Sequence, residues 1–220
     1  ASASQPLYVL LSPDGKLLAY AYDDNGSERF DLHISNLETG EELKAFIPGG
    51  CSAPWLGPEH LDLPLGQDEV AHCDGPMPGG GGSMLGSSAI TVMDEDTDIV
   101  KAAWRVARFY ARESCGKCTP CREGAGWLDK IMRRIVDGYG RPEDLDLLRD
   151  VSDNIIPGSA FPYKMTTICF VGPSATVPIL SALQMFPEEF QARITRPAGE
   201  PEPHPITLEP SRRAGDGVAH

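Results

Sequence analysis

Apolar and polar residues alternate in short runs along the first 43 positions. The runs "LYVLL", "KLLAYAY" and "FDLHISNL" each have the length and alternation of a half-buried strand. Between them lie "SPDGK" and "DDNGSE", and the second contains the hairpin-favouring pair Asn25-Gly26. The pattern predicts three strands joined by two turns, so residues 1–43 are interpreted as a β-meander.

After Leu43 the chain changes character. "LKAFI" predicts a strand, Gly-rich and Pro-rich turns follow, and a glycine run leads into a second predicted strand at Ala89–Met93. No Lys-Ser/Thr pair follows the glycines, so we interpret the run as a linker or tight turn and not as a phosphate-binding loop. We assign residues 44–96 to a small β-rich domain.

Residues 97–196 have the 3–4 spacing of apolar positions that predicts helices. The predicted helices lie in "TDIVKAAWRVARFYARES", "GWLDKIMRRIVDGYG", "RPEDLDLLRDVSDNI", "VPILSALQMF" and "PEEFQARI". We place Trp127 on the apolar face of the second helix and Pro142 in the first turn of the third. Residues 197–220 are rich in Pro, Gly and charge, which predicts a disordered tail. The expected fold class is α+β, with a helical bundle at 97–196.

Bulk properties exclude several classes of partner. The net charge of −13 over 220 residues argues against nucleic acid and against an anionic membrane surface. No run approaches the roughly 20 apolar residues of a membrane span, so direct membrane insertion is not expected. No basic region precedes the first apolar run, so a secretory signal is not expected. We expect a cytoplasmic protein that can dock peripherally on the inner face of a membrane as part of a complex.

Three cysteines at intervals of three carry the clearest chemistry. "ESCGKCTPCREG" contains Cys115, Cys118 and Cys121, and such a row of thiolates is typical of an iron–sulfur cluster that takes its fourth ligand from elsewhere. Cys51, Cys73 and Cys169 are the candidates for that ligand. We favour Cys169 because it lies in the same helical region. Structural zinc held by four thiolates is the alternative for this site.

Positive charge is concentrated around these cysteines. Residues 101–142 carry ten basic and four acidic side chains within an acidic chain. Solvated helix faces would explain this bias. The sharper interpretation is that Arg112, Lys117 and Arg122 offset an anionic cluster and favour its reduced form. Cys51 and Cys73 are interpreted as free thiols.

Four stretches together resemble a known family: "LKAFIPGG", "GSMLGSSAITVMDED", "FYARESCGKCTPCREG" and "TIC". Over roughly residues 43–196 the chain resembles the carboxy-terminal part of the NADH-binding flavoprotein subunit of respiratory complex I. Related diaphorase subunits of hydrogenases and formate dehydrogenases share these motifs. The resemblance implies a β-grasp-like domain followed by a four-helix bundle. It also implies a 4Fe–4S cluster on Cys115, Cys118, Cys121 and Cys169 that accepts electrons from a flavin.

The resemblance also implies partners and cofactors. The partners would be other subunits of an NADH-oxidising complex. FMN and NAD belong to the family, but no residue here matches their binding domain. Residues 1–43 resemble instead a propeller-blade segment of prolyl-oligopeptidase-type peptidases, through "SPDGK" and "LAY", although no G-x-S-x-G nucleophile motif is present.

The function predicted from the sequence is therefore an electron relay through one 4Fe–4S cluster in an assembly of the NADH:quinone oxidoreductase type. The alternative is a zinc-bound or cofactor-poor scaffold module. Peptidase activity has only the first 43 residues in its favour.

Overall fold

The computed structural model describes residues 8–11, 17–22, 31–36, 43–77, 81–87, 89–159 and 162–197. The chain divides into two compact units between Asp98 and Ile99, and Pro162 groups with the first unit. The finer boundaries at 1–43, 44–96, 97–196 and 197–220 stay a prediction. The predicted disordered tail lies outside the described residues, apart from Pro197.

Three antiparallel strands begin the first unit. They are β1 (Tyr8–Leu11), β2 (Leu17–Tyr22) and β3 (Asp31–Asn36), paired in the order β1-β2-β3. Leu18 of β2 lies opposite Leu11 on one side and Ser35 on the other. The three predicted strands are therefore confirmed, whereas the two predicted turns fall outside the described residues.

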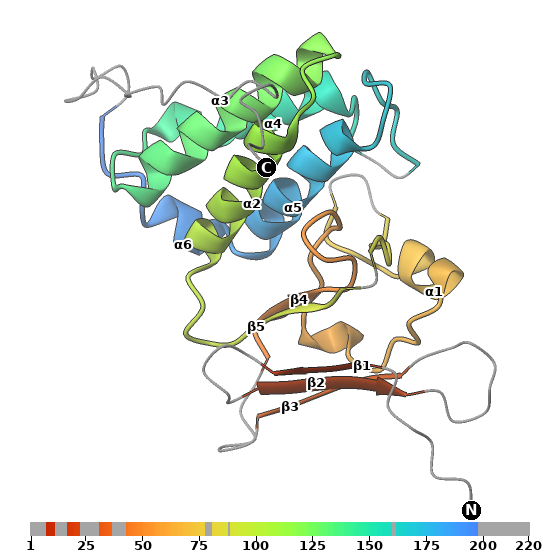
Figure 1. Ribbon diagram of the computed structural model, residues 1–220. Helices are drawn as coiled ribbons and strands as arrows, with labels where there is room; N and C mark the ends of the chain where they lie inside the picture. The colour runs from red at the N-terminus through yellow and green to blue at the C-terminus, as the bar shows by residue number, and fades with distance from the viewer. Residues whose placement is uncertain are drawn as a thin grey trace, which may run out of the picture. The chain divides into compact units, whose positions relative to one another are not determined.

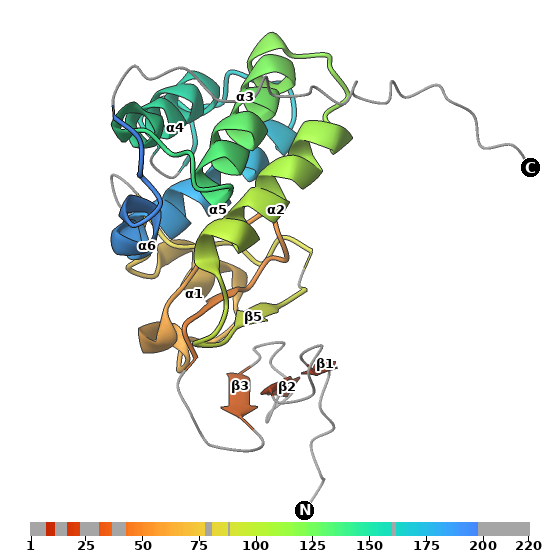
Figure 2. The same cartoon turned by 90° about the vertical axis from the view of Figure 1, so that its left-hand side faces the viewer.

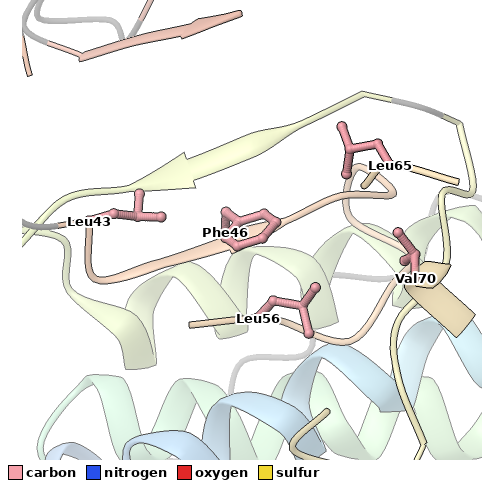
Figure 3. Packing of buried hydrophobic residues seen from close by; sticks show 5 residues of the cluster. All are labelled: Leu43, Phe46, Leu56, Leu65 and Val70. Atoms are coloured by element: carbon pink, nitrogen blue, oxygen red, sulfur yellow. The ribbon is translucent and has the colours of Figure 1, made fainter. Parts of the chain in front are cut away.

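A second, two-stranded sheet pairs β4 (Ala45–Ile47) with β5 (Thr91–Met93). Phe46 exchanges two backbone hydrogen bonds with Leu56, both 2.8 Å long, which adds a short bridge beside β4. A hydrophobic cluster forms around these elements, and Figure 3 shows its five buried side chains together: Leu43, Phe46, Leu56, Leu65 and Val70. The strand predicted at Ala89–Met93 is present as β5, which is shorter because it begins at Thr91.

Two short elements in this unit had no counterpart in the prediction. They are the 3-10 turn η1 (Pro58–His60) and the helix α1 (Gln67–His72). Helix α1 has six residues, and Val70 is its buried position. With one buried position it has no repeating apolar face, so the spacing of apolar residues did not predict it. Asp68 and Glu69 in its first turn are the local signal, because carboxylates favour a helix amino terminus.

Helices make up the second unit: α2 (Ile99–Glu113), α3 (Thr119–Val136), α4 (Pro142–Ile155), α5 (Val171–Met185) and α6 (Pro187–Gln191). In Figures 1 and 2, α2 packs against α3 and α5, and α4 packs against the same two helices. The four long helices therefore share one core. Helices combined with small sheets give the α+β class that the sequence predicts.

Helix α3 corrects one prediction. It begins at Thr119, inside the cysteine motif, whereas the sequence suggested a helix starting near Trp127. A Cβ at Gly124 would lie 2.8 Å from Cδ1 of Ile155, so the glycine allows α3 and α4 to approach closely. Trp127 was also misplaced, because it is 52% exposed and does not join the apolar face.

Helix α5 is longer than predicted and almost entirely buried. It starts at Val171 rather than near Val177 and continues through Pro178. Proline lacks the N–H that would bond the preceding turn. Two hydroxyl groups of the helix also bond carbonyls about one turn back, since Thr176 donates to Pro173 O and Ser181 donates to Val177 O.

A buried ion pair joins α3 to the start of α4. Asp144 is completely buried and accepts hydrogen bonds from two nitrogens of Arg134, one of them Nε at 2.9 Å. The same carboxylate accepts the backbone N–H of Arg141 at 2.9 Å, which caps α4. Among the residues that the structure describes, no helix is both long enough and apolar enough to cross a membrane.

Candidate metal centre

A sharp turn joins α2 to α3 and carries the first two cysteines (Figure 1). The N–H of Ser114 still bonds the carbonyl of Tyr110 at 3.0 Å, so the turn starts directly at the end of α2. Gly116 then adopts a φ of +77°, which a residue with a Cβ rarely adopts. This reversal leaves Cys115 exposed and places Cys118 at the N-cap of α3.

Arg122 fastens this turn to the first turn of α3. Its Nη1 donates to the carbonyl of Gly116 at 2.9 Å, and its Nε donates to Glu123 at 2.9 Å. Its backbone N–H bonds the carbonyl of Cys118 at 2.9 Å. The side chain is about half exposed, so its positive charge remains largely solvated. Arg122 therefore shapes the cysteine turn through its hydrogen bonds.

Cys121 lies in the first turn of α3 and is the buried member of the row, at 6% exposure. Burial raises the pKa of its thiol, the hydrogen bond with the Ser114 hydroxyl lowers it, and the charges of Cys169, Cys118 and Cys115 raise it.

The segment before α5 brings Cys169 to this place. Thr166 is fixed to the end of α4, because its N–H bonds Ile155 O at 3.1 Å and its hydroxyl bonds Asn154 O at 2.8 Å. The N–H of Ile168 donates to Cys118 Sγ at 3.3 Å, which joins the segment directly to the cysteine row. Thr167 donates to the carbonyl of Cys169 at 2.9 Å and stabilises the last bend before α5.

The other two candidate cysteines lie in the first unit. Cys73 donates to the carbonyl of Val70 at 3.3 Å, and burial raises the pKa of its thiol. Cys51 is half-buried. The cysteine row, by contrast, lies in the second unit.

Sequence reasoning missed two hydrogen-bonding partners of the sulfurs. One is the hydroxyl of Ser114, 3.3 Å from Cys121 Sγ, and the other is the backbone N–H of Ile168. The position of Ser114, directly before the first cysteine, was visible in the sequence. A backbone donor fifty positions from its acceptor leaves no signal in a sequence.

The donor chemistry of this place suits an iron–sulfur cluster. The four sulfurs are free thiols, two of them meet hydrogen-bond donors, and thiolates are the usual cluster ligands. The same four thiolates would suit zinc. Within the described ranges, no three His, Cys, Asp or Glu side chains are close enough to hold a single metal ion, so the four-cysteine site is a proposal.

Comparison with known proteins gives evidence that is independent of the geometry of the cysteines. Residues 101–193 match the family described as the NADH-ubiquinone oxidoreductase-F iron-sulfur binding region. The NADH-quinone oxidoreductase F subunit of Mycobacterium tuberculosis (strain H37Rv) is 43% identical over 162 residues, which are 74% of this chain and 33% of that protein. Its counterpart of the same name in Streptomyces coelicolor is 45% identical over 159 residues, covering 72% of this chain and 32% of that protein.

Two less similar proteins also match this chain. The mitochondrial 51 kDa subunit of Neurospora crassa NADH-ubiquinone oxidoreductase is 37% identical over 174 residues, 79% of this chain and 32% of that protein. A crystal structure of an NAD+-reducing [NiFe]-hydrogenase in the H2-reduced state matches with a TM-score of 0.56 and 26% identity, over 70% of this chain and 24% of that one. The chain spans about a third of the length of the curated relatives that it matches. Over residues 101–193 the chain is similar to the NADH-ubiquinone oxidoreductase-F iron–sulfur binding region.

Proposed function

We propose that this chain holds one 4Fe–4S cluster through Cys115, Cys118, Cys121 and Cys169 and relays single electrons in an NADH-oxidising assembly. One observation carries the proposal: the N–H of Ile168, the residue directly before Cys169, donates a hydrogen bond to Cys118 Sγ at 3.3 Å. The similarity of residues 101–193 to an iron–sulfur binding region supports the same cofactor.

Three features of the fold would support such a site. The turn at Gly116, held by Arg122, would point the first two thiolates in one direction. Helix α3 buries Cys121, which keeps water away from one side of the site. The hydroxyl of Thr166 bonds carbonyls at the end of α4, which would help to hold the segment that carries Cys169. When bound, the cluster would supply reversible one-electron transfer, and the protein would set its potential.

The finer architecture and the assembly are part of this proposal. Residues 44–96 would be a β-grasp-like domain and 97–196 a four-helix bundle. Relatives named as subunits of NADH-quinone oxidoreductase support other subunits as partners. We infer that the flavin that delivers electrons, and the NADH that reduces the flavin, bind elsewhere in that assembly. The chain would then work in the cytoplasm, docked at the periphery of the membrane.

The test is metal analysis of the full chain purified without oxygen. About four irons and four sulfides per chain are expected in the wild type, since a 4Fe–4S cluster contains that number. Cys169→Ser should lose iron, whereas Cys73→Ser, a matched change at a cysteine outside the site, should not. Stoichiometric zinc without iron, before and after reconstitution, would overturn the relay and favour the zinc-bound scaffold that the same thiolates allow.

A further inference from the structure

The side chain of Ser114 is fixed between the end of α2 and the buried cysteine. Its Oγ lies 3.3 Å from Cys121 Sγ and 3.4 Å from the backbone nitrogen of Gly116. Its own N–H is bound to the carbonyl of Tyr110 at 3.0 Å. The hydroxyl therefore has two neighbours with different hydrogen-bonding roles, and a backbone that holds it in place.

These neighbours decide where the hydroxyl proton points. Gly116 N–H can only donate, so Ser114 Oγ accepts that hydrogen bond. The hydroxyl keeps its single proton for another acceptor, and Cys121 Sγ is within reach. A thiolate that binds metal has no proton to give, so in the loaded site Ser114 must be the donor and Cys121 the acceptor.

We propose that Ser114 tunes the redox potential of the cluster by donating a hydrogen bond to Cys121 Sγ. This inference rests on the proposed function. Reduction adds one electron to the cluster and moves the total charge of cluster and thiolates from about −2 to −3, with no bond formed or broken. The added charge spreads onto the sulfurs, so a donor at one of them stabilises the reduced form more than the oxidised form. The potential rises as a result.

The burial of Cys121 favours this hydrogen bond over the basic side chains as the stronger influence. Cys121 is 6% exposed, and a hydrogen bond in such surroundings is electrostatically stronger than one in water. Arg122 is about half exposed and binds Glu123 and the carbonyl of Gly116, so solvent and its partners weaken its effect on the sulfur.

The experiment compares four full-length chains after anaerobic reconstitution: wild type, Ser114→Ala, Ser114→Thr and Thr119→Ala. Each is titrated with dithionite, and the reduced cluster is measured by EPR. Ser114→Ala should make reduction about tenfold less favourable, which is about 59 mV for one electron. Ser114→Thr keeps the hydroxyl and should stay within about twofold of wild type. Thr119→Ala removes a hydroxyl of the same region that contacts Arg122 rather than sulfur, and should leave the potential unchanged.

If Ser114→Ala holds no iron, Ser114→Gly replaces it, because glycine is favoured directly after a helix. A wild-type potential in the variant without the hydroxyl overturns the inference, and so does an equal shift in Thr119→Ala. The two proposals fail separately. A wild type without iron refutes the cluster itself, whereas a loaded wild type with an unchanged Ser114→Ala potential refutes only the role of Ser114.

Discussion

Gly172, in the first turn of α5, offers a test of how the fold holds Cys169. A Cβ at this position would lie 2.6 Å from Thr167 Oγ1, 2.7 Å from Thr167 Cγ2 and 3.0 Å from Ile155 Cγ2. Thr167 is buried, and its hydroxyl donates to the carbonyl of Cys169 at 2.9 Å. Gly172→Ala would therefore push Thr167 away and disturb the bend that carries the fourth proposed ligand, without changing a cysteine.

The expected change in the free energy of unfolding is the sum of three contributions. Forcing a methyl group into a packed site typically costs about 1–3 kcal/mol. Loss of the Thr167 hydrogen bond adds about 0.5–1.5 kcal/mol. The better helix propensity of alanine returns at most about 1 kcal/mol. The free energy of unfolding should thus fall by about 0.5–4.5 kcal/mol, and the disturbed bend should weaken iron binding.

Urea denaturation followed by far-UV circular dichroism measures the first effect, and iron retention during anaerobic gel filtration measures the second. Gly126→Ala is the matched control, because a Cβ at Gly126 in α3 meets nothing within 4 Å. That change should stabilise the chain by up to about 1 kcal/mol through helix propensity alone. If Gly172→Ala proves as stable as wild type and retains its iron, close packing against Thr167 does not hold Cys169 in place.

The remaining predictions concern charged and titratable groups of the second unit. Asp144→Asn should cost about 3–5 kcal/mol in urea denaturation, because it removes the buried carboxylate charge that pairs with Arg134. The exposed Asp146→Asn should change stability by less than about 0.5 kcal/mol. Burial raises the pKa of Tyr163 from 10.0 to about 12. The fold therefore favours the neutral phenol, and this stabilisation is complete below pH 10 and lost as pH rises towards 12. Tyr163→Phe should remove that loss from the stability-against-pH curve, and an unchanged curve would contradict it. Arg122→Ala should lower the midpoint potential in an EPR-monitored titration if its charge helps the reduced state, and an unmoved potential would contradict that role.

Sequence pattern predicted those parts of the fold that repeat over many residues. Helix α2 has five buried apolar positions at helical spacing, and α4 begins at Pro142 as expected. The antiparallel strands β1 to β3 were visible through alternation and turn residues. The cysteine row needed only its spacing to suggest a cluster. These features are local, so the neighbouring residues contain the information.

Other features depend on contacts between distant segments. Gly124 favours a turn by local propensity, but in the fold it makes room for Ile155 of another helix. Trp127 fits an apolar stripe, although α3 turns this position outwards. The bond from Ile168 N–H to Cys118 Sγ joins residues fifty positions apart. The spacing of apolar residues along the chain does not predict contacts between distant segments, because tertiary packing and not local propensity determines them.

The central claim is that four cysteines of this chain hold a redox-active cluster. EPR of the full chain, reconstituted without oxygen and reduced with dithionite, tests it most directly, with Cys169→Ser and Cys51→Ser measured beside the wild type. We expect a reduced-cluster signal of about one spin per four irons in wild type and in Cys51→Ser, and a weakened or altered signal in Cys169→Ser. A wild type without any reduced-cluster signal, or a Cys169→Ser spectrum identical to that of the wild type, would contradict the account.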